Sequence, residues 1–428
     1  MATDVEVQFF SHLNGLTLGN NWGDLIRLLD KALVTGLDFT QITAASIDAQ
    51  GDVHITLYAA HNAMLFQVVE LSGFTPTSLN QKYRIKGVPN TTQLILKPAL
   101  DIAERSITSI GAGKLASLGY EIIFRDTGDV KRVYRAKNPT TQHPFIRVDE
   151  SLTSQDGVTG VYDSSYAKYA MIGLLEHMEH IDDYENPDVL QLPFDSNDPI
   201  KNWRISGIGE DVIRGWSRWY VARQGGAGLL QSSIDGYPPE NGNRKFTLVG
   251  DKDAFYILQA VLAVNNSRML QGCGLINGAL TNGNIPSWFL ISTLTQNKAS
   301  AAISLSEMVG GTALAANSNI RSQVHLCKYD QIKRLQPTIG SNGILPDYTT
   351  GFSKLYPGND VAALEIPLAD TTGFLRGTLK HIYYAGGDLS NLTQTTPVSS
   401  DSSMFVADKT IVTANLNGGF YFYLGVIE

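Results

Sequence analysis

The fold is decided by the stretch HITLYAAHNAMLFQVVELSGFTPTSLNQKYRIKGVPNTTQLIL, residues 54–96. Four short runs in it are rich in β-branched and aromatic residues. They are separated by Ser72-Gly73, Thr75-Pro76 and Pro89-Asn90. This spacing predicts a meander of short strands that closes as a small barrel or sandwich. No catalytic residue is needed to explain the pattern.

The length of the chain, 428 residues, favours two or three domains. Hydrophobic residues make up 43% of it and charged residues 17%, as in a globular protein. We expect an α+β fold that is predominantly β, with small β-barrel or sandwich modules and a few short helices. The predicted divisions are an N-terminal helical segment (1–45), the barrel or sandwich module (46–98), a mixed β-rich domain (99–224) and a C-terminal β-rich domain (225–428).

The charge balance bears on the class of partner. Lys and Arg number 33 against 41 Asp and Glu, which gives a net charge of −8. Binding to nucleic acid depends on clustered basic residues, so nucleic acid is not expected as the main partner. With so few charges, the surface must consist largely of Ser, Thr, Asn and Gln. Such a surface suits burial against other subunits as well as it suits water.

Cysteine usage and the N-terminus indicate a chain made in a reducing compartment. Cys273 and Cys327 lie far apart and have no partner at metal-ligand spacing, so we expect reduced, buried thiols. The N-terminus shows no basic and apolar leader pattern, and no run of about 18 apolar residues occurs. We therefore expect synthesis in a cytoplasm and no membrane span.

Residues 22–36 predict an amphipathic helix. Six apolar residues share one face at helical spacing, namely Leu25, Ile26, Leu28, Leu29, Ala32 and Leu33. Asn21 is placed to cap the start, and Gly36 to end the helix in a left-handed conformation. The apolar face can pack on its own domain or on a neighbouring copy, and the first is more common.

Two patterns suggest sites for a phosphate or a metal. Gly111-Ala112-Gly113-Lys114 lacks the earlier Gly and the following Ser or Thr of a phosphate loop, because those positions hold Thr108 and Leu115. His177 and His180 lie among Glu176, Glu179, Asp182 and Asp183, but no complete zinc-protease motif is present. We interpret this segment as a solvated helix end and predict no metal or cofactor, with a metal-dependent hydrolase as the alternative.

An aromatic group of Trp203, Trp216, Trp219 and Tyr220 has two interpretations. It can form a platform for a sugar, or it can pack in a core or interface, which is the commoner use of large aromatic residues. No Gly-x-Ser-x-Gly elbow and no thiol–imidazole pair occurs. We predict that the protein is not an enzyme and has no catalytic residues.

The later part of the chain reads as short strands separated by turns. Gly225–Gly228 and Tyr237-Pro238-Pro239 predict a linker. Strands are expected at residues 254–264, 287–295, 362–368 and 378–384. A closing hairpin is predicted from residues 409–416 and 420–427, with Asn417-Gly418-Gly419 as its turn. Phe420, Tyr421, Phe422 and Tyr423 in its second strand are expected to be buried on both faces.

Several islands of sequence resemble a family of structural virion proteins from the tails of long-tailed bacteriophages and prophages. In the small β module, the resemblance rests on His61, Val68-Val69, Leu71-Ser72-Gly73, Thr75-Pro76, Leu79-Asn80, Tyr83-Arg84-Ile85, Val88 and Thr91-Thr92. Gln81 stands where the family has Gly, so the turn must be built differently. Further islands are Leu118-Gly119-Tyr120-Glu121 with Phe124, Val133-Tyr134-Arg135, Arg147-Val148-Asp149-Glu150, residues 175–183, Leu248-Val249-Gly250-Asp251 with Phe255-Tyr256, and Leu375-Arg376-Gly377 with Leu379.

These islands occur in the expected order along nearly the whole chain. Read from the residues, Asp126-Thr127-Gly128-Asp129 and Gly250-Asp251 are turns between strands. Arg135, Arg147 and Asp149 are expected to form a structural ion-pair set. The resemblance implies a non-enzymatic component of a phage tail, in the baseplate or tail-end assembly, whose partners are copies of itself and the tube, sheath or hub proteins. The alternative is a receptor- or glycan-binding tail protein.

Overall fold

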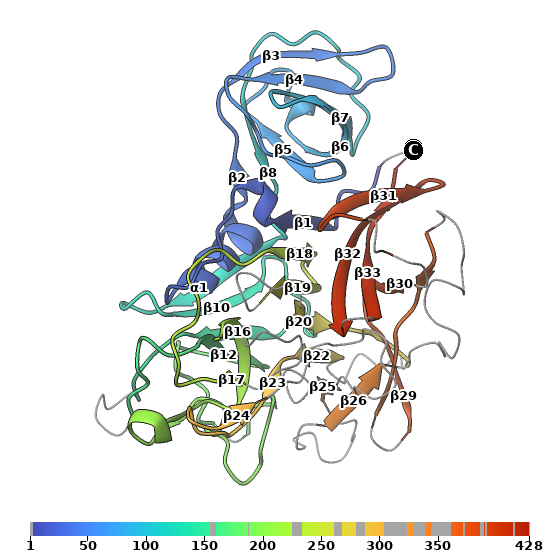
Figure 1. Cartoon of the computed structure of the whole chain (residues 1–428). Coiled ribbons are helices and arrows are strands. Elements are labelled where there is room, and N and C mark those ends of the chain that lie inside the picture. Colours follow the sequence, from blue (N-terminus) through green and yellow to red (C-terminus); the bar gives the residue numbers. More distant parts are fainter. Residues whose placement is uncertain are drawn as a thin grey trace.

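A computed structural model describes residues 3–154, 160–186, 188–224, 233–260, 268–279, 287–303, 323–327, 339–343, 361–370, 373–385, 389, 392–413 and 416–427. Within these ranges the chain is built of several antiparallel sheets and very little helix, which confirms the predominantly β fold class (Figure 1).

The predicted small module is a curved seven-stranded sheet at the top of Figure 1. Its strands are β2 (Leu37–Asp38), β3 (Ile42–Ile47), β4 (Val53–Leu57), β5 (Val68–Ser72), β6 (Lys82–Asn90), β7 (Gln93–Pro98) and β8 (Ala112–Leu115). They lie in the order β2-β8-β5-β6-β7-β4-β3. The two edge strands β2 and β3 follow one another in the chain, so the sheet curls into a half-barrel. A short 3₁₀ helix, η3 (Thr77–Leu79), precedes β6.

The module is wider than the predicted range 46–98. Strand β8 pairs with β5 through Val69 and Leu115, and β2 pairs with the other side of β8 through Leu37. Both β2 and β8 lie outside the predicted range, because their membership depends on pairing between residues distant in sequence. The Gly111–Lys114 pattern lies at the start of β8. It is therefore a strand of the module and not a phosphate loop.

The N-terminal helix forms as predicted on its buried face, but its ends differ. Helix α1 (Asp24–Leu29) continues as a π-helical segment, η2 (Asp30–Thr35), and the six predicted apolar residues are all at most 2% exposed. The Asn21 cap is wrong: Gly23 occupies the cap position, and the Asp24 carboxylate accepts the Asn21 N–H at 2.9 Å. Gly36 ends the segment as expected and has a positive φ of 74°, but its ψ of −168° differs from the predicted left-handed helical conformation.

Residues 1–45 are not a separate helical unit, because their first strand belongs to a sheet of the C-terminal half. Strand β1 (Gln8–Ser11) leads into η1 (His12–Asn14) and pairs with β18 (Phe246–Gly250). Ten strands follow the order β1-β18-β19-β20-β22-β25-β26-β28-β29-β21. The remaining members are β19 (Ala254–Ala260), β20 (Arg268–Leu275), β21 (Asn277–Gly278), β22 (Trp288–Ile291), β25 (Gln323–Leu326), β26 (Ile339–Gly343), β28 (Pro367–Asp370) and β29 (Leu375–Thr378).

A second large sheet is formed mainly by the middle of the chain. Its strands are β9 (Tyr120–Arg125), β10 (Lys131–Ala136), β11 (Phe145–Asp149), β12 (Lys168–Leu175), β13 (Gln191–Leu192), β16 (Ser217–Ala222) and β23 (Thr293–Leu294). Strand β23 comes from the predicted C-terminal domain and pairs with β16, so the predicted boundary at 224/225 does not divide the sheets. Nearby lie η4 (Gly209–Asp211) and two small pairs, β14 (Ile205–Ser206) with β15 (Ile213–Arg214), and β17 (Ser233–Ile234) with β24 (Ala302–Ile303).

The chain ends in a five-stranded sheet, in the order β27-β30-β33-β32-β31. Its strands are β27 (Ala363–Leu364), β30 (Ile382–Ala385), β31 (Thr396–Ser400), β32 (Ser403–Thr413) and β33 (Leu416–Val426). The predicted closing hairpin is present, but its predicted turn is wrong. Asn417, Gly418 and Gly419 lie within β33 and pair with β32, and Thr413 pairs with Leu416 closer to the true turn.

The other strand predictions for this half are confirmed in part. Residues 287–295 contain β22 and β23, residues 362–368 contain β27 and the start of β28, and residues 378–384 contain most of β30. Strand β19 ends at Ala260, and residues 261–264 of the first predicted strand lie outside the described residues. The first part of the predicted linker, residues 225–228, also lies outside them. Phe420, Tyr421 and Phe422 are buried as expected, and Tyr423 is half-buried.

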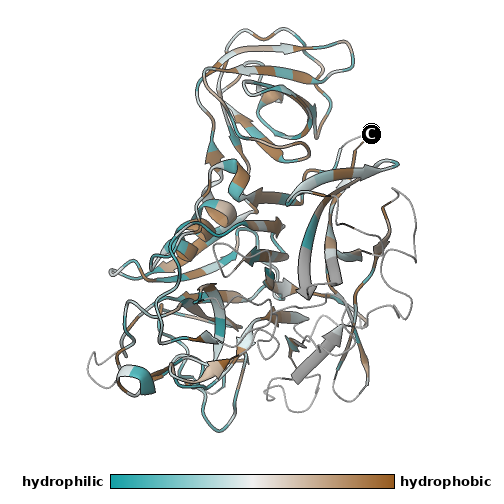
Figure 2. Cartoon of the chain, in the orientation of Figure 1, coloured by the Kyte–Doolittle hydropathy of each residue, from teal (hydrophilic) through white to brown (hydrophobic). Residues whose placement is uncertain are grey.

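One apolar core connects the small module, the ten-stranded sheet and the second large sheet. Leu25 of α1, Val69 of β5, Tyr134 of β10 and Leu248 of β18 belong to the same buried cluster. Figure 2 shows apolar residues along α1 and the adjoining strands. The helix therefore packs on its own chain, as predicted. No helix of the described ranges has the length and apolar character that a membrane crossing requires.

Candidate functional site

The histidine-rich segment does not form the predicted helix end. After β12 the chain runs through turns, and His177 is 61% exposed with its Nε2 atom 3.5 Å from Glu179. The ring of His177 packs edge-on against Phe145, and His180 is exposed. In the part of the chain that the structure describes, no three His, Cys, Asp or Glu side chains are grouped as a metal site. The helix prediction is wrong because β12 continues to Leu175 and a turn follows it.

The aromatic group is split between the core and a cavity wall. Trp219 and Tyr220 of β16 are fully buried, and the indole N–H of Trp219 donates to the Ile291 carbonyl oxygen at 2.9 Å. Trp216 is half-buried beneath the Lys201 amine, and Trp203 is 6% exposed. Core packing is confirmed for Trp219 and Tyr220, so the four residues do not form one exposed platform.

Two of the three residues of the predicted ion-pair set, Arg147 and Asp149, form an ion pair, and Arg135 does not take part. Arg147 lies 2.9 Å from Asp149 and 2.6 Å from Asp182. Its guanidinium also stacks over the Trp203 ring, at 4.4 Å from the ring centre. Arg135 lies apart from this set and stacks over Phe145 at 4.3 Å. Arg135 belongs to the neighbouring strand β10, where its cross-strand partner on β9 is Glu121.

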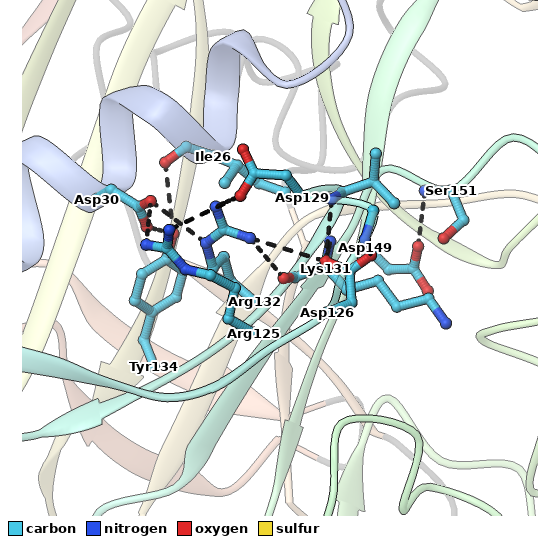
Figure 3. A network of polar contacts seen from close by, with 12 residues as sticks. Ile26, Asp30, Arg125, Asp126, Asp129, Lys131, Arg132, Tyr134, Asp149 and Ser151 are labelled. Atoms are coloured by element: carbon cyan, nitrogen blue, oxygen red, sulfur yellow. Dashed lines mark hydrogen bonds and ion pairs between the residues drawn. The ribbon is translucent and has the colours of Figure 1, made fainter.

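A second polar network joins the helical segment to the β9–β10 hairpin (Figure 3). The hydroxyl of Tyr134 donates to Asp30 at 2.7 Å, and Arg132, only 1% exposed, lies 3.3 Å from the same carboxylate. Arg132 also pairs with Asp129. Asp126, in the predicted turn, accepts the backbone N–H groups of residues 130 and 131. These groups hold the helix on the sheet, because each buried charge meets an opposite charge or a hydrogen-bond partner.

A cavity of about 760 Å³ opens where the ends of β10 and β11 meet the loop before β14. Three aromatic side chains, Trp22, Tyr184 and Trp203, line it together with Asp149 and Glu150. Aliphatic side chains and hydroxyl groups complete the wall. Mixed linings of this kind, with a few polar groups among apolar ones, are typical of small-molecule sites.

The two adjacent carboxyl groups in this wall are in different electrostatic states. Burial opposes ionisation of Asp149, but the charges of Arg147 and Arg214 outweigh it and lower its pKa. Burial raises the pKa of Glu150 to about 7, against the weaker opposing effects of Arg214 and Arg27. Asp149 is therefore a fixed anion, whereas Glu150 gains and loses a proton near neutral pH.

Two buried polar atoms of the wall lack a hydrogen-bond partner among the described residues. They are the indole nitrogen Nε1 of Trp203 and the carboxyl oxygen Oε2 of Glu150. Leaving such groups unpaired costs about 1–3 kcal/mol each. A polar molecule that reached these two buried atoms would remove this cost.

Sequence reasoning did not single out this site. Trp203 was considered only with the aromatic residues that follow it, and Glu150 appeared only as the end of a matching island. The adjacent acids Asp149-Glu150 after an apolar strand were the available signal. The groups that act on the Glu150 carboxyl, among them Gly23 and Arg214, come from distant parts of the chain.

Comparison with known proteins adds no relative. The chain matches no protein-family model and none of the curated proteins.

Proposed function

We propose that this protein is a structural component of a bacteriophage tail, in the baseplate or tail-end assembly, that works through permanent interfaces with copies of itself and with tube, sheath or hub proteins. In this proposal it resides in the virion and is not an enzyme. Its resemblance to structural tail proteins supplies the class, and the roles of the matching residues in the fold support it.

The observation that carries the proposal is the position of Arg84, one of the matching residues of the small module. Its guanidinium is fully buried and donates hydrogen bonds to backbone carbonyls of Asp4, Val7, Phe66 and Leu424. One side chain thus fastens the half-barrel to both ends of the chain. A residue used in this way stiffens the molecule, as a load-carrying subunit requires.

Other matching residues also act as joints between elements. Asp251, in the β18–β19 turn, accepts the backbone N–H groups of Asp253 and Ala254 and lies 3.0 Å from His381. In a second example, Arg376 of β29 pairs with a buried carboxylate at the end of β28. These side chains hold backbone segments in place, and this use favours a mechanical role over a chemical one.

Removing the chain from the particle tests the proposal. We expect a phage or prophage that lacks this gene to produce particles without complete tails in electron micrographs, and to regain tails when the wild-type chain is supplied. The double variant His177→Ala/His180→Ala should restore tails equally well, because neither side chain holds the fold. Normal, infectious tailed particles in the absence of the chain would contradict the proposal.

The glycan-binding alternative loses its predicted platform, since Trp219 and Tyr220 face the core. Of the four aromatic residues, Trp203 lines the cavity.

A further inference from the structure

The cavity beside β11 has the size of a ligand site. Its volume of about 760 Å³ lies within the range of roughly 300–1,000 Å³ that is usual for small-molecule pockets. Its wall is assembled from segments far apart in sequence, since Trp22 precedes α1, Lys131 begins β10, Met171 belongs to β12 and Ile205 begins β14. The surrounding sheet holds it open.

Lys131, Asp149 and Arg204 of the wall are already paired within the protein, whereas the exposed Glu185 has no ion pair among the described residues. Lys131 donates to Asp182 at 2.8 Å. Asp149 pairs with Arg147, and Arg204 forms two hydrogen bonds with Asp198, at 2.6 and 2.7 Å. An ionic ligand would have to compete with these pairs for its counter-charge. The wall therefore disfavours an anionic ligand, and the Glu185 carboxylate adds to this effect.

The aromatic rings of the wall argue separately against a cationic ligand. Arg147 already lies over the Trp203 ring at 4.4 Å, and Arg214 lies over the Trp22 ring at 5.1 Å. An aromatic cage binds a cation through ring faces that are free to receive it. Here the protein supplies both cations, so a second cation would meet like charge.

What remains suits hydroxyl groups on a partly apolar frame. The hydroxyl-bearing residues of the wall are Ser151, Thr153, Ser154, Ser206 and Tyr184. The unpartnered groups are the Trp203 Nε1–H donor and the Glu150 carboxyl oxygen. A hydroxyl group accepts from the first and donates to the second. Saccharide rings carry such hydroxyls at their edges and C–H groups on their faces, which pack on aromatic and aliphatic side chains.

We propose that this cavity binds a neutral saccharide of one or two rings, with the Trp203 indole N–H and the Glu150 carboxyl group as hydrogen-bonding partners. The site is independent of the proposed role in tail structure, and either proposal can fail without the other. In a particle, it would give this chain a contact with sugar-bearing surfaces.

Binding can be measured on the full-length chain by saturation-transfer NMR followed by titration calorimetry. The probes are the methyl glycosides of glucose, galactose, mannose, N-acetylglucosamine and N-acetylgalactosamine, with maltose and chitobiose as two-ring probes. Glucuronic acid and glucosamine serve as charged comparators. We expect at least one neutral probe to bind with a dissociation constant below about 10 mM and the charged comparators to bind more weakly.

Two variants locate the binding. Trp203→Phe removes the indole N–H and should weaken binding about tenfold, whereas Ser206→Trp should abolish it by filling the cavity from its half-buried edge. The control is Trp216→Phe, the same change on a neighbouring tryptophan that is not part of the wall. Thermal melting checks that each variant is folded, and Ser206→Trp decides the matter if Trp203→Phe is not.

Three results would overturn the proposal: no neutral probe binds, a charged comparator binds equally well, or binding survives unchanged in Ser206→Trp. An effect of Trp216→Phe as large as that of Trp203→Phe would also count against this site.

Discussion

The Nη2 atom of Arg84 donates a 2.8 Å hydrogen bond to the carbonyl oxygen of Leu424, 340 positions later in the chain. The same nitrogen reaches the Asp4 carbonyl at 2.7 Å, and Nη1 reaches the carbonyls of Val7 and Phe66 at 2.9 and 2.7 Å. Burial lowers the pKa of Arg84 to about 10, so the guanidinium still carries its charge at neutral pH. A single cation thus bridges the segment before β1, the small module and the last strand.

Replacing this cation should loosen all three segments together. Arg84→Met keeps most of the side-chain volume but leaves four buried carbonyl groups without their donor, and we expect a loss of about 3–5 kcal/mol in the free energy of unfolding. Chemical denaturation followed by tryptophan fluorescence measures it. Arg105→Met is the matched control, because Arg105 is exposed and donates to the carbonyls of Asp48 and Ala49. Equal effects of the two changes would contradict the assignment.

The buried pair of Arg268 and Asp408 joins the ten-stranded sheet to the last sheet, at 2.6 Å and with both side chains 0% exposed. Asp408→Asn leaves the arginine charge in place without this carboxylate, and should lower the free energy of unfolding by about 3 kcal/mol. The comparison is Asp211→Asn, which breaks the exposed pair with Lys298. That change should cost less than about 1 kcal/mol, and a smaller cost for Asp408→Asn than for Asp211→Asn would refute the prediction.

Glu150 makes stability depend on pH near neutrality. Burial raises its pKa from 4.5 to about 7, so the folded state binds this proton more tightly than the unfolded state does. Its contribution is complete below pH 4.5 and is lost as the pH rises through 7. Relative to Glu150→Gln, the wild type should therefore lose stability by up to roughly 1.4 kcal/mol per pH unit in this window.

Urea titrations between pH 4.5 and 8 check this difference. Glu185→Gln is the control, because Glu185 is an exposed residue of the same cavity wall. A difference between wild type and Glu150→Gln that does not change with pH would show that the pKa of Glu150 is the same in the folded and unfolded states, and would contradict the prediction.

His325 should have the opposite effect at acidic pH. Burial lowers the pKa of this β25 side chain to about 4, so the unfolded state binds the proton more tightly. Its contribution is present above pH 6.5 and is lost as the pH falls toward 4. His325→Gln should reduce the acid sensitivity of thermal unfolding, whereas His177→Gln, at a 61% exposed position, should not. Unchanged acid sensitivity of His325→Gln would contradict the burial of this ring.

Local sequence determined the parts of this protein that depend on near neighbours. The spacing of Leu25 to Leu33 defines a buried helical face whatever covers it. In the β18–β19 turn, the Asp251 side chain caps backbone N–H groups only two and three residues away. Alternation of apolar and polar residues likewise marked β4 and β7. Such signals depend only on residues that lie within a few positions of one another in the sequence.

Tertiary structure alone decided which strands share a sheet and which polar groups are buried. Nothing near Gln8 shows that its strand pairs with residues 247–250, and the Gly418-Gly419 signal was misleading because the strand pairing continues through it. Glu150 became a titrating wall residue only when distant segments excluded water from it. Strand pairing and the burial of polar groups depend on residues distant in sequence. A local pattern does not identify those residues, so only the folded chain shows the sheet order and the buried polar groups.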